Sequence, residues 1–489
     1  MRKIFLKKEP CLIAKQKAFP YQEEAFNAVK DLPYSGIFHE QGLGKTKIAI
    51  DLALYWLEKK DIDTVLIVTK KQLVQNWVNE FKFHTHIKPT VLNNNKQNNF
   101  YVFNGASRIV ITNFETVSGE KERFKLYLKS RNVAIIIDES AKLKNPEAKL
   151  TMDFIDLSPL FKIKTIMTGT PVANRPYDIW SQIYFLDNGD SLGTIFEDFK
   201  RNTNLSNDLY KNKEKQKLFE ENINSIYDKI NSFTVRETKN SNIINLPAKK
   251  YINELVNFEK HQELLYEKVR NELTILVEKN SEIVVDDSTQ ILKRLLRLVQ
   301  IASNPKLVDE SYTNITNKEK KLNELVGTII NNQEKCIIWS NFIENVDYFA
   351  KKYAEYKAVK IHGKMTIEDR NQSVEKFKKD DYKILIATPQ AAKEGLTLTM
   401  ANHVIFYDRG FSLDDYLQAQ DRIHRISQKK TCYVYNIMIE NSIDTWVDTL
   451  LNAKKASAAL AQGDITIEEY QNISNYSFGE IIKSILKIE

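Results

Sequence analysis

The chain has 489 residues, of which 42% are hydrophobic and 28% are charged, a composition typical of folded globular proteins and not of disordered ones. Its length predicts roughly two to four domains, and its net charge of +7 allows a polyanionic partner without requiring one. Three cysteines spread along the chain argue against a disulfide framework and favour a reducing compartment. No apolar run approaches the roughly 18 residues of a membrane-spanning helix, and the N-terminus does not resemble a secretory signal.

A glycine-rich stretch near the N-terminus, Glu40–Thr46, reads EQGLGKT and lies between a short apolar segment and a helical apolar pattern. A strand, turn and helix of this kind cradle phosphate, because free backbone N–H groups and the positive end of the helix dipole face the anion. Lys45 is expected to reach the outer phosphates, and the Thr46 hydroxyl is expected to hold Mg²⁺. The strict consensus has a further glycine where His39 stands, so a simple turn that caps a helix remains an alternative. The candidate nucleotide contacts in this stretch are Gly42, Gly44, Lys45 and Thr46.

Short β-branched runs recur through the first third of the chain and are apolar at consecutive positions, as buried parallel strands require. Helical patterns separate them, for example over residues 71–83. This alternation predicts a doubly wound α/β lobe, which binds its ligands at the carboxyl ends of its strands. The runs are Val65–Thr69, Ile109–Thr112, Val133–Ile137 and Lys164–Met167.

Two carboxylates, Asp138 and Glu139, follow one of these runs directly. Nucleotide hydrolysis needs one carboxylate near Mg²⁺ and one that orients or deprotonates water. Asp138 suits the first role and Glu139 the second, although the same residues are also good helix-capping chemistry. The turn Thr168-Gly169-Thr170 follows another run, and its hydroxyls could bond a carboxylate or a phosphate, but turn chemistry alone would also explain them.

The pattern changes in the second half of the chain. Residues 187–333 are rich in Lys, Asn and Glu and show long helical periodicity, which predicts a helical insertion and linker. Strand-like runs then return between residues 336 and 438, which predicts a second α/β lobe without a phosphate loop, followed by a helical tail. The expected division is 1–190 for lobe 1, 191–310 for the insertion and linker, 311–445 for lobe 2 and 446–489 for the tail.

Two arginines of the second lobe, Arg422 and Arg425, occur in the stretch QAQDRIHR. Their spacing predicts that they share one helical face. Two guanidinium groups held together suit the charge that develops on a γ-phosphate. Ordinary surface arginines pair with carboxylates, and the neighbouring Asp421 offers that alternative.

The order of these motifs resembles that of the Swi/Snf-type DNA translocases of helicase superfamily two. The resemblance runs from about Phe19 to Ile443. In the first lobe it includes the segments FPYQEEA (19–25), EQGLGKT (40–46), IIIDESAKLKN (135–145) and TIMTGTPVANRPYDIWSQIYFLDN (165–188). The linker SFTVRETK (232–239) is also similar. In the second lobe it includes HGKMTIEDR (362–370), EGLTLTMANHVIFYD (394–408) and QAQDRIHRISQ (418–428).

The resemblance implies two RecA-like parallel-sheet lobes in tandem that use ATP and Mg²⁺ and act on DNA. It implies that Gln22 contacts adenine, that Gly395 belongs to the nucleotide site, and that Arg422 and Arg425 are arginine fingers. Backbone contacts with DNA are expected from strand-end loops, because such contacts position a protein without reading sequence. The candidate nucleic-acid contacts are Lys70, Asn113, Ser340, Thr388 and Lys393.

Three departures from the family pattern matter. The family often has His where Ala141 stands, which puts the link between hydrolysis and strand engagement in doubt. Ala392-Lys393 replaces a common Gly-Gly pair, and Thr397 replaces Asn. Lys393 could add a phosphate contact or could lie on the surface.

These observations predict an ATP-dependent double-stranded DNA translocase that displaces proteins or remodels branched or replicating DNA. One alternative is a strand-separating helicase that acts on forks or RNA. Another is an ATP-gated nucleic-acid clamp or loading factor with little turnover. The expected location is the cytoplasm of a bacterial or phage-infected cell, away from membranes, and the recruiting protein is not indicated.

Overall fold

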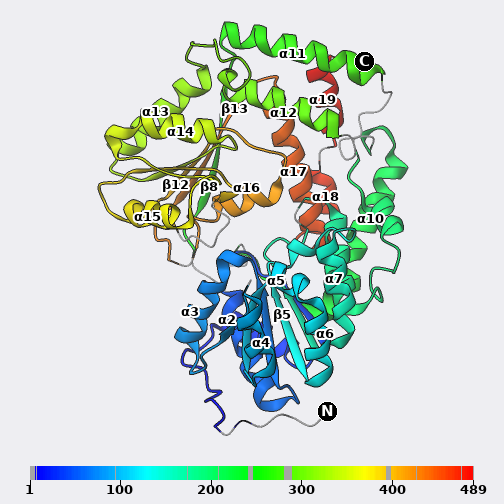
Figure 1. The fold of residues 1–489 in the computed structure, drawn as a ribbon. Coiled ribbons are helices and arrows are strands. Elements are labelled where there is room, and N and C mark those ends of the chain that lie inside the picture. The colour runs from blue at the N-terminus through cyan, green and yellow to red at the C-terminus, as the bar shows by residue number, and fades with distance from the viewer. Residues whose placement is uncertain are drawn as a thin grey trace. The chain divides into compact units, whose positions relative to one another are not determined.

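The computed structural model describes residues 6, 8–93, 95–172, 174–206, 209–239, 246–279, 289–391, 398–425, 427–474 and 476–487. The chain divides into two compact units (Figure 1). The first unit comprises Met1–Asn204, Phe219–Ile244 and Ala458–Ile467, and the second comprises Leu205–Leu218, Asn245–Ser457 and Glu468–Glu489. Each unit has its own sheet and core.

The first unit is built on a parallel sheet, whose strands are blue to cyan in Figure 1 apart from the last. Within the described residues seven strands form it, in the order β3-β4-β2-β5-β6-β1-β7, and every pairing is parallel. The strands are β1 (Tyr34–Ile37), β2 (Thr64–Thr69), β3 (Thr90–Val91), β4 (Ile109–Asn113), β5 (Val133–Asp138), β6 (Ile163–Met167) and β7 (Thr234–Val235).

Helices connect and cover these strands. The helix after β1 packs its apolar face into the core, where Ile48, Trp56 and Leu57 lie with Ile67 and Ile136 of the central strands. Burial of such side chains contributes about 1.5–3 kcal/mol each. The helices are α1 (Pro20–Val29), α2 (Lys45–Lys59), α3 (Val74–His84), α4 (Lys96–Asn104), α5 (Phe114–Gly119), α6 (Lys121–Ser130), α7 (Lys149–Leu157), α8 (Trp180–Asp187) and α9 (Phe196–Thr203), together with α10 (Lys213–Ile230) from Phe219 onward.

The second unit has a second parallel sheet. In its described part six strands run in the order β10-β11-β9-β12-β13-β8, again with parallel pairings. The strands are β8 (Lys249–Val256), β9 (Cys336–Trp339), β10 (Val359–Ile361), β11 (Ile384–Ala387), β12 (His403–Phe406) and β13 (Cys432–Ile439). The helices are α11 (Lys260–Lys279), α12 (Thr289–Ser303), α13 (Asn317–Asn331), α14 (Ile343–Lys352), α15 (Ile367–Lys378), α16 (Leu413–Gln420), α17 (Ile443–Ala461), α18 (Ile467–Ile473) and α19 (Phe478–Leu486). The end of α17 from Ala458 and the first residue of α18 belong to the first unit.

The predicted fold class is confirmed, because two parallel-sheet α/β lobes occur in tandem with helical segments between and after them. The domain bounds expected from the sequence stay a prediction. Within the stretch expected to be insertion and linker, β7 joins the first sheet and β8 joins the second. Among the described residues, no helix combines the length and apolar character that crossing a membrane demands.

Candidate nucleotide-binding site

The predicted phosphate loop is the turn between β1 and α2. Gly42 and Gly44 adopt φ values of 87° and 70°, in the left-handed region that glycine enters without steric cost. At Gly44 space is also limited, since a Cβ there would lie 2.3 Å from Gln22 Nε2. The backbone conformation of this turn therefore explains both glycines, and Lys45 begins the helix that follows.

Gln22 on α1 braces this loop. Its Oε1 accepts a hydrogen bond from the Phe19 N–H at 3.0 Å, and its Nε2 donates to Leu43 O at 3.4 Å and to Gly44 O at 3.5 Å. The expected contact with adenine stays a prediction. In this structure the amide of Gln22 contacts the loop backbone, which the sequence did not indicate.

Lys45 points back into its own loop. Its Nζ donates to His39 O at 2.8 Å and to Glu40 O at 3.2 Å. Burial lowers the pKa of Lys45 to about 8, although the nearby carboxylates of Glu139 and Asp138 act in the opposite direction. The two carbonyl oxygens that hold this buried ammonium are uncharged, so an anionic phosphate would be a stronger partner for it.

This lowered pKa predicts that nucleotide affinity depends on pH. Only the protonated Lys45 attracts phosphate, and protonation falls as the pH rises through about 8. A bound phosphate raises the pKa of Lys45, so the affinity for ATP should weaken about tenfold between about pH 7 and pH 9. Titration of a fluorescent ATP analogue at several pH values would measure this. The variant Lys45→Ala should bind weakly with no such dependence, and a flat profile for the unmodified chain would contradict the assignment.

The acidic pair lies at the carboxyl end of β5, two strands away from β1 in the sheet. Asp138 Oδ2 accepts hydrogen bonds from Thr69 Oγ1 at 2.9 Å and from Trp77 Nε1 at 2.8 Å. Burial raises the pKa of Asp138, and the adjacent Glu139 carboxylate raises it further. A bound cation would offset both effects. Glu139 has a φ of 57°, which is uncommon for a residue other than glycine.

The turn Thr168-Gly169-Thr170 follows β6, which lies between β5 and β1 in the sheet. A Cβ on Gly169 would lie 2.7 Å from Gln41 Cγ and 3.4 Å from Lys45 Nζ. This turn therefore lies directly against the phosphate loop. Phosphate loop, threonine turn and acidic pair thus occupy one edge of one sheet, as the sequence predicted for ligands of a doubly wound lobe.

Two further side chains hold this edge together, and sequence reasoning missed both. Trp77 lies within the helical pattern predicted over residues 71–83, and in the structure its indole also donates to Asp138. Gln182 Oε1 accepts from Ser140 Oγ at 2.8 Å, while its Nε2 donates to Pro171 O at 2.8 Å. Gln182 therefore joins the acidic segment to the threonine turn. The signal for Gln182 that the sequence offered was a polar residue within an otherwise apolar helix, because a buried polar side chain needs hydrogen-bond partners.

The segment after β7, part of the predicted linker signature, runs beside the phosphate loop. Glu40 N–H donates to Glu237 O at 2.9 Å. The Arg236 guanidinium donates to Phe38 O at 2.7 Å and forms a two-pronged ion pair with Asp464. The linker thus supports the loop from the side opposite the acidic pair.

These residues fit a nucleotide with Mg²⁺. The described residues contain no group of three or more His, Cys, Asp or Glu side chains that could hold a metal by themselves. A Mg²⁺ ion bound through one or two protein oxygens and substrate phosphates needs no such group. Asp138 and the Thr46 hydroxyl are the protein oxygens that the sequence assigns to that role.

In the second unit, the two arginines do not share a helical face, so that interpretation is wrong. α16 ends at Gln420, and Arg422 and Arg425 lie in the turn that follows. Leu398 N–H donates to Arg422 O at 3.0 Å, and Gln428 Nε2 donates to Ile423 O at 2.9 Å. A continuing helix would use these carbonyls for its own hydrogen bonds.

The start of β8 fixes this arginine turn from the other side. Lys249 Nζ lies 2.8 Å from Asp421 Oδ1, and His424 Nε2 lies 2.8 Å from Pro247 O. Asp421, the carboxylate that the sequence offered as an alternative partner for the arginines, thus forms an ion pair with Lys249 of the predicted linker. Arg422 is only 2% exposed, so its side chain is buried in this structure.

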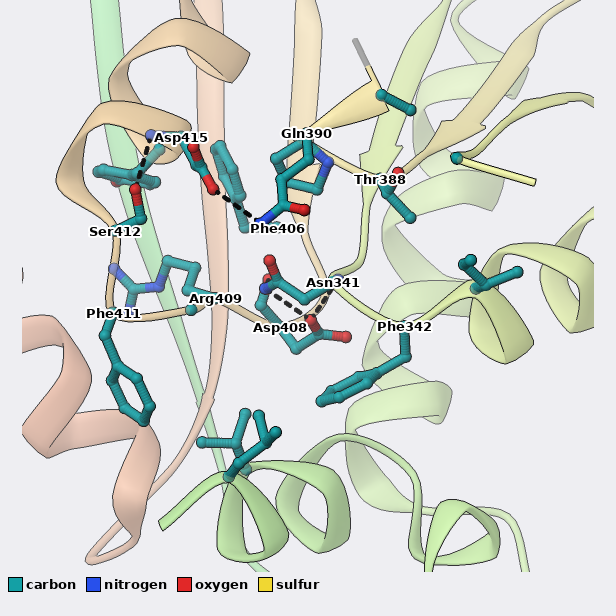
Figure 2. Close-up of a pocket in the computed structure, with 18 of the residues that line it drawn as sticks. Asn341, Phe342, Thr388, Gln390, Phe406, Asp408, Arg409, Phe411, Ser412 and Asp415 are labelled. Carbon is teal, nitrogen blue, oxygen red and sulfur yellow. Dashed lines mark hydrogen bonds between the residues drawn. The ribbon is translucent and has the colours of Figure 1, made fainter. Parts of the chain in front are cut away.

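A cavity of about 650 Å³ lies at the carboxyl ends of β9, β11 and β12 in the second unit (Figure 2). Asp408 organises its rim. The carboxylate accepts from Ser340 Oγ at 2.5 Å and from the Asn341 N–H at 2.7 Å, and also from Ser303 Oγ at 2.8 Å. Figure 2 shows Asn341 beside Asp408, with Thr388 further along the rim.

The candidate nucleic-acid contacts that the structure describes fall at strand ends, and their roles stay predictions. Asn113 is 4% exposed and caps α5 through the Thr116 N–H at 2.9 Å. Ser340 is fully buried, so a contact through its hydroxyl would have to break the bond to Asp408. Thr388 lines the cavity, and Lys70 follows β2. Lys393, Gly395 and the other departures at 392–397 lie outside the described residues.

Fold and site together define a two-lobed parallel-sheet protein with a phosphate loop and an acidic pair in its first lobe. Residues 26–307 match the SNF2-related domain, and residues 317–427 match the helicase conserved C-terminal domain. The chain belongs to the SNF2-related family, which confirms the resemblance drawn from its motifs.

Relatives of this family are similar over most of the chain. The chain is 28% identical to the uncharacterized ATP-dependent helicase MG018 of Mycoplasma genitalium, covering 89% of this chain and 41% of that protein. It is 27% identical to the putative ATP-dependent helicase/translocase YwqA of Bacillus subtilis, covering 89% and 48%. The chain thus spans less than half the length of these curated relatives. Among solved structures, the Sulfolobus solfataricus SWI2/SNF2 ATPase core in complex with dsDNA matches at 22% identity and a TM-score of 0.42, covering 96% of this chain and 99% of that chain.

Proposed function

We propose that the chain is an ATP-dependent motor that moves along double-stranded DNA. The observation that carries this proposal is the edge of the first sheet, where buried Lys45 lies near Asp138 and Glu139. Membership of the SNF2-related family supports it, as do relatives named ATP-dependent helicases. The work of such a motor would be to displace proteins from DNA or to remodel branched or replicating DNA.

Each site residue has a role in the proposed reaction. Lys45 binds the outer phosphates, and Glu139 orients the attacking water. Asp138 and Thr46 would hold Mg²⁺, which neutralises charge on the phosphates. Arg422 and Arg425 of the second unit stabilise the charge that develops on the γ-phosphate, and Gln22 contacts the adenine.

In this proposal, both units contribute to the nucleotide site only during part of the ATP cycle, and this alternation produces movement. ATP stabilises the arrangement in which the arginines reach it, and hydrolysis releases that arrangement. Loops at strand ends grip the DNA backbone alternately and read little sequence. We propose that this activity takes place in the cytoplasm of a bacterial or phage-infected cell, which the relatives from Mycoplasma and Bacillus support.

The proposal predicts that duplex DNA stimulates ATP turnover more than single-stranded DNA or RNA of equal nucleotide concentration. It also predicts a steep loss of DNA affinity with added salt, because phosphate contacts release counterions. Steady-state ATPase assays with the three polymers, repeated across a salt series, measure both. A clear preference for single strands or RNA would favour the strand-separating helicase. Consumption limited to about one ATP per chain would favour the clamp.

A further inference from the structure

Lys70 lies beside Glu139 because of the register of two central strands. β2 and β5 are adjacent and parallel, and the last pair in their register is Val68 and Ile137. The next position along each strand brings Thr69 to Asp138, which share a hydrogen bond of 2.9 Å. One position further, Lys70 Nζ lies 3.7 Å from Glu139 Oε2. The ion pair thus continues the strand pairing.

Lys70 also lies between two groups of residues at the carboxyl ends of the strands. On one side, β4 ends at Asn113, a candidate nucleic-acid contact, and Asn113 is the strand partner of Thr69. On the other side lie the acidic pair, the threonine turn and the phosphate loop. Lys70 therefore lies between a candidate nucleic-acid contact and the carboxylate to which our proposal assigns the orientation of water.

The ion pair is weak enough to be exchanged. The side chains of Lys70 and Glu139 are 25% and 17% exposed, and their charged atoms are 3.7 Å apart. Partly exposed pairs at such distances contribute little to stability. A phosphate oxygen is a strong partner for an ammonium group, and Lys70 cannot engage both anions with full strength.

We infer that Lys70 couples DNA binding to ATP hydrolysis. Without DNA, Lys70 holds the Glu139 side chain to the β2 side of the edge. When duplex DNA binds, Lys70 forms an ion pair with one of its backbone phosphates instead of with Glu139. Glu139 is then free to turn toward the γ-phosphate and orient the attacking water. Lys70 is a positioning residue in this scheme, which rests on the proposed function.

The variant Lys70→Gln tests the inference in the full chain. Without DNA its ATP turnover should rise about threefold to fivefold, because the restraint on Glu139 is lost. Turnover at saturating duplex should stay near that of the unmodified chain, so the stimulation ratio falls, and the KM for ATP should not change. A merely structural role for Lys70 would lower turnover and thermal stability together. Lys70→Arg keeps a cation and should keep the stimulation ratio.

Lys71→Gln is the matched control, since Lys71 is the next residue, is exposed and forms no ion pair with Glu139 among the described contacts. It should leave turnover without DNA unchanged. If Lys70→Gln also leaves that turnover unchanged while duplex still stimulates the unmodified chain, the inference is overturned and the proposed function stands. If duplex does not stimulate the unmodified chain, both are overturned.

Discussion

Replacing Glu139 with Gln is expected to lower ATP turnover about a thousandfold while ATP binding persists. The amide cannot accept the proton of the attacking water, and general-base catalysis contributes about 10²–10⁴-fold to rates. Lys45 and the glycine turn, which bind the phosphates in our proposal, are unchanged in this variant. Steady-state turnover on duplex DNA, together with binding of a fluorescent ATP analogue, measures the two effects separately.

Glu122→Gln provides the matched control for this variant. Glu122 lies on α6 with a side chain that is 80% exposed, far in sequence from the acidic pair. Its replacement should change turnover by less than about twofold, because exposed surface substitutions have small effects. Near-normal turnover of Glu139→Gln would refute the assignment of this carboxylate.

Replacing Arg425 with Ala is expected to reduce ATP turnover about 10³-fold or more, the range found for arginines that act on a transferring phosphoryl group. Arg422→Lys should also be severe, because lysine lacks the planar fork that can bind two phosphate oxygens. Binding of ATP should change much less, because the phosphate loop is intact. Single-turnover hydrolysis at saturating DNA measures the defect directly.

Because Arg422 is buried, replacing it can lower the stability of the fold as well as catalysis, so the stability of each variant has to be measured. Thermal unfolding of each variant separates loss of catalysis from loss of folding, and Arg297→Ala on the exposed part of α12 serves as the control. If folded Arg425→Ala and Arg422→Lys variants both retain normal turnover, the arginines do not act on the nucleotide. The proposed motor would then have no link from the second unit to hydrolysis.

Local sequence was enough to predict the strands and the phosphate loop. Runs such as Val133–Ile137 are apolar at every position, which only a strand buried on both faces tolerates, and β5 has this burial. Gly42 and Gly44 mark a backbone conformation that other residues avoid. The long helical periodicity over residues 187–333 likewise corresponds to helices such as α10 and α12. These features depend on neighbours in sequence.

β8 and the turn that carries Arg422 and Arg425 show where the local sequence pattern did not predict the structure. β8 alternates between half-buried and exposed residues and carries a weak apolar signal, yet all eight of its residues pair with β13. Arg422 and Arg425 have helical spacing, but hydrogen bonds from Leu398 and Gln428 hold their backbone in a turn. In both places partners distant in sequence outweighed local preference.

The sequence by itself determined the family, the two-lobed fold and the residue types of the candidate site. Only the tertiary structure decided which of those residues touch. Apolar periodicity shows that a segment is a buried strand, but it does not give the order of strands in the sheet. The order β4-β2-β5 places Trp77 and Thr69 on Asp138 and Lys70 beside Glu139. These contacts join residues more than 60 positions apart, so their formation depends on the packing of the whole lobe.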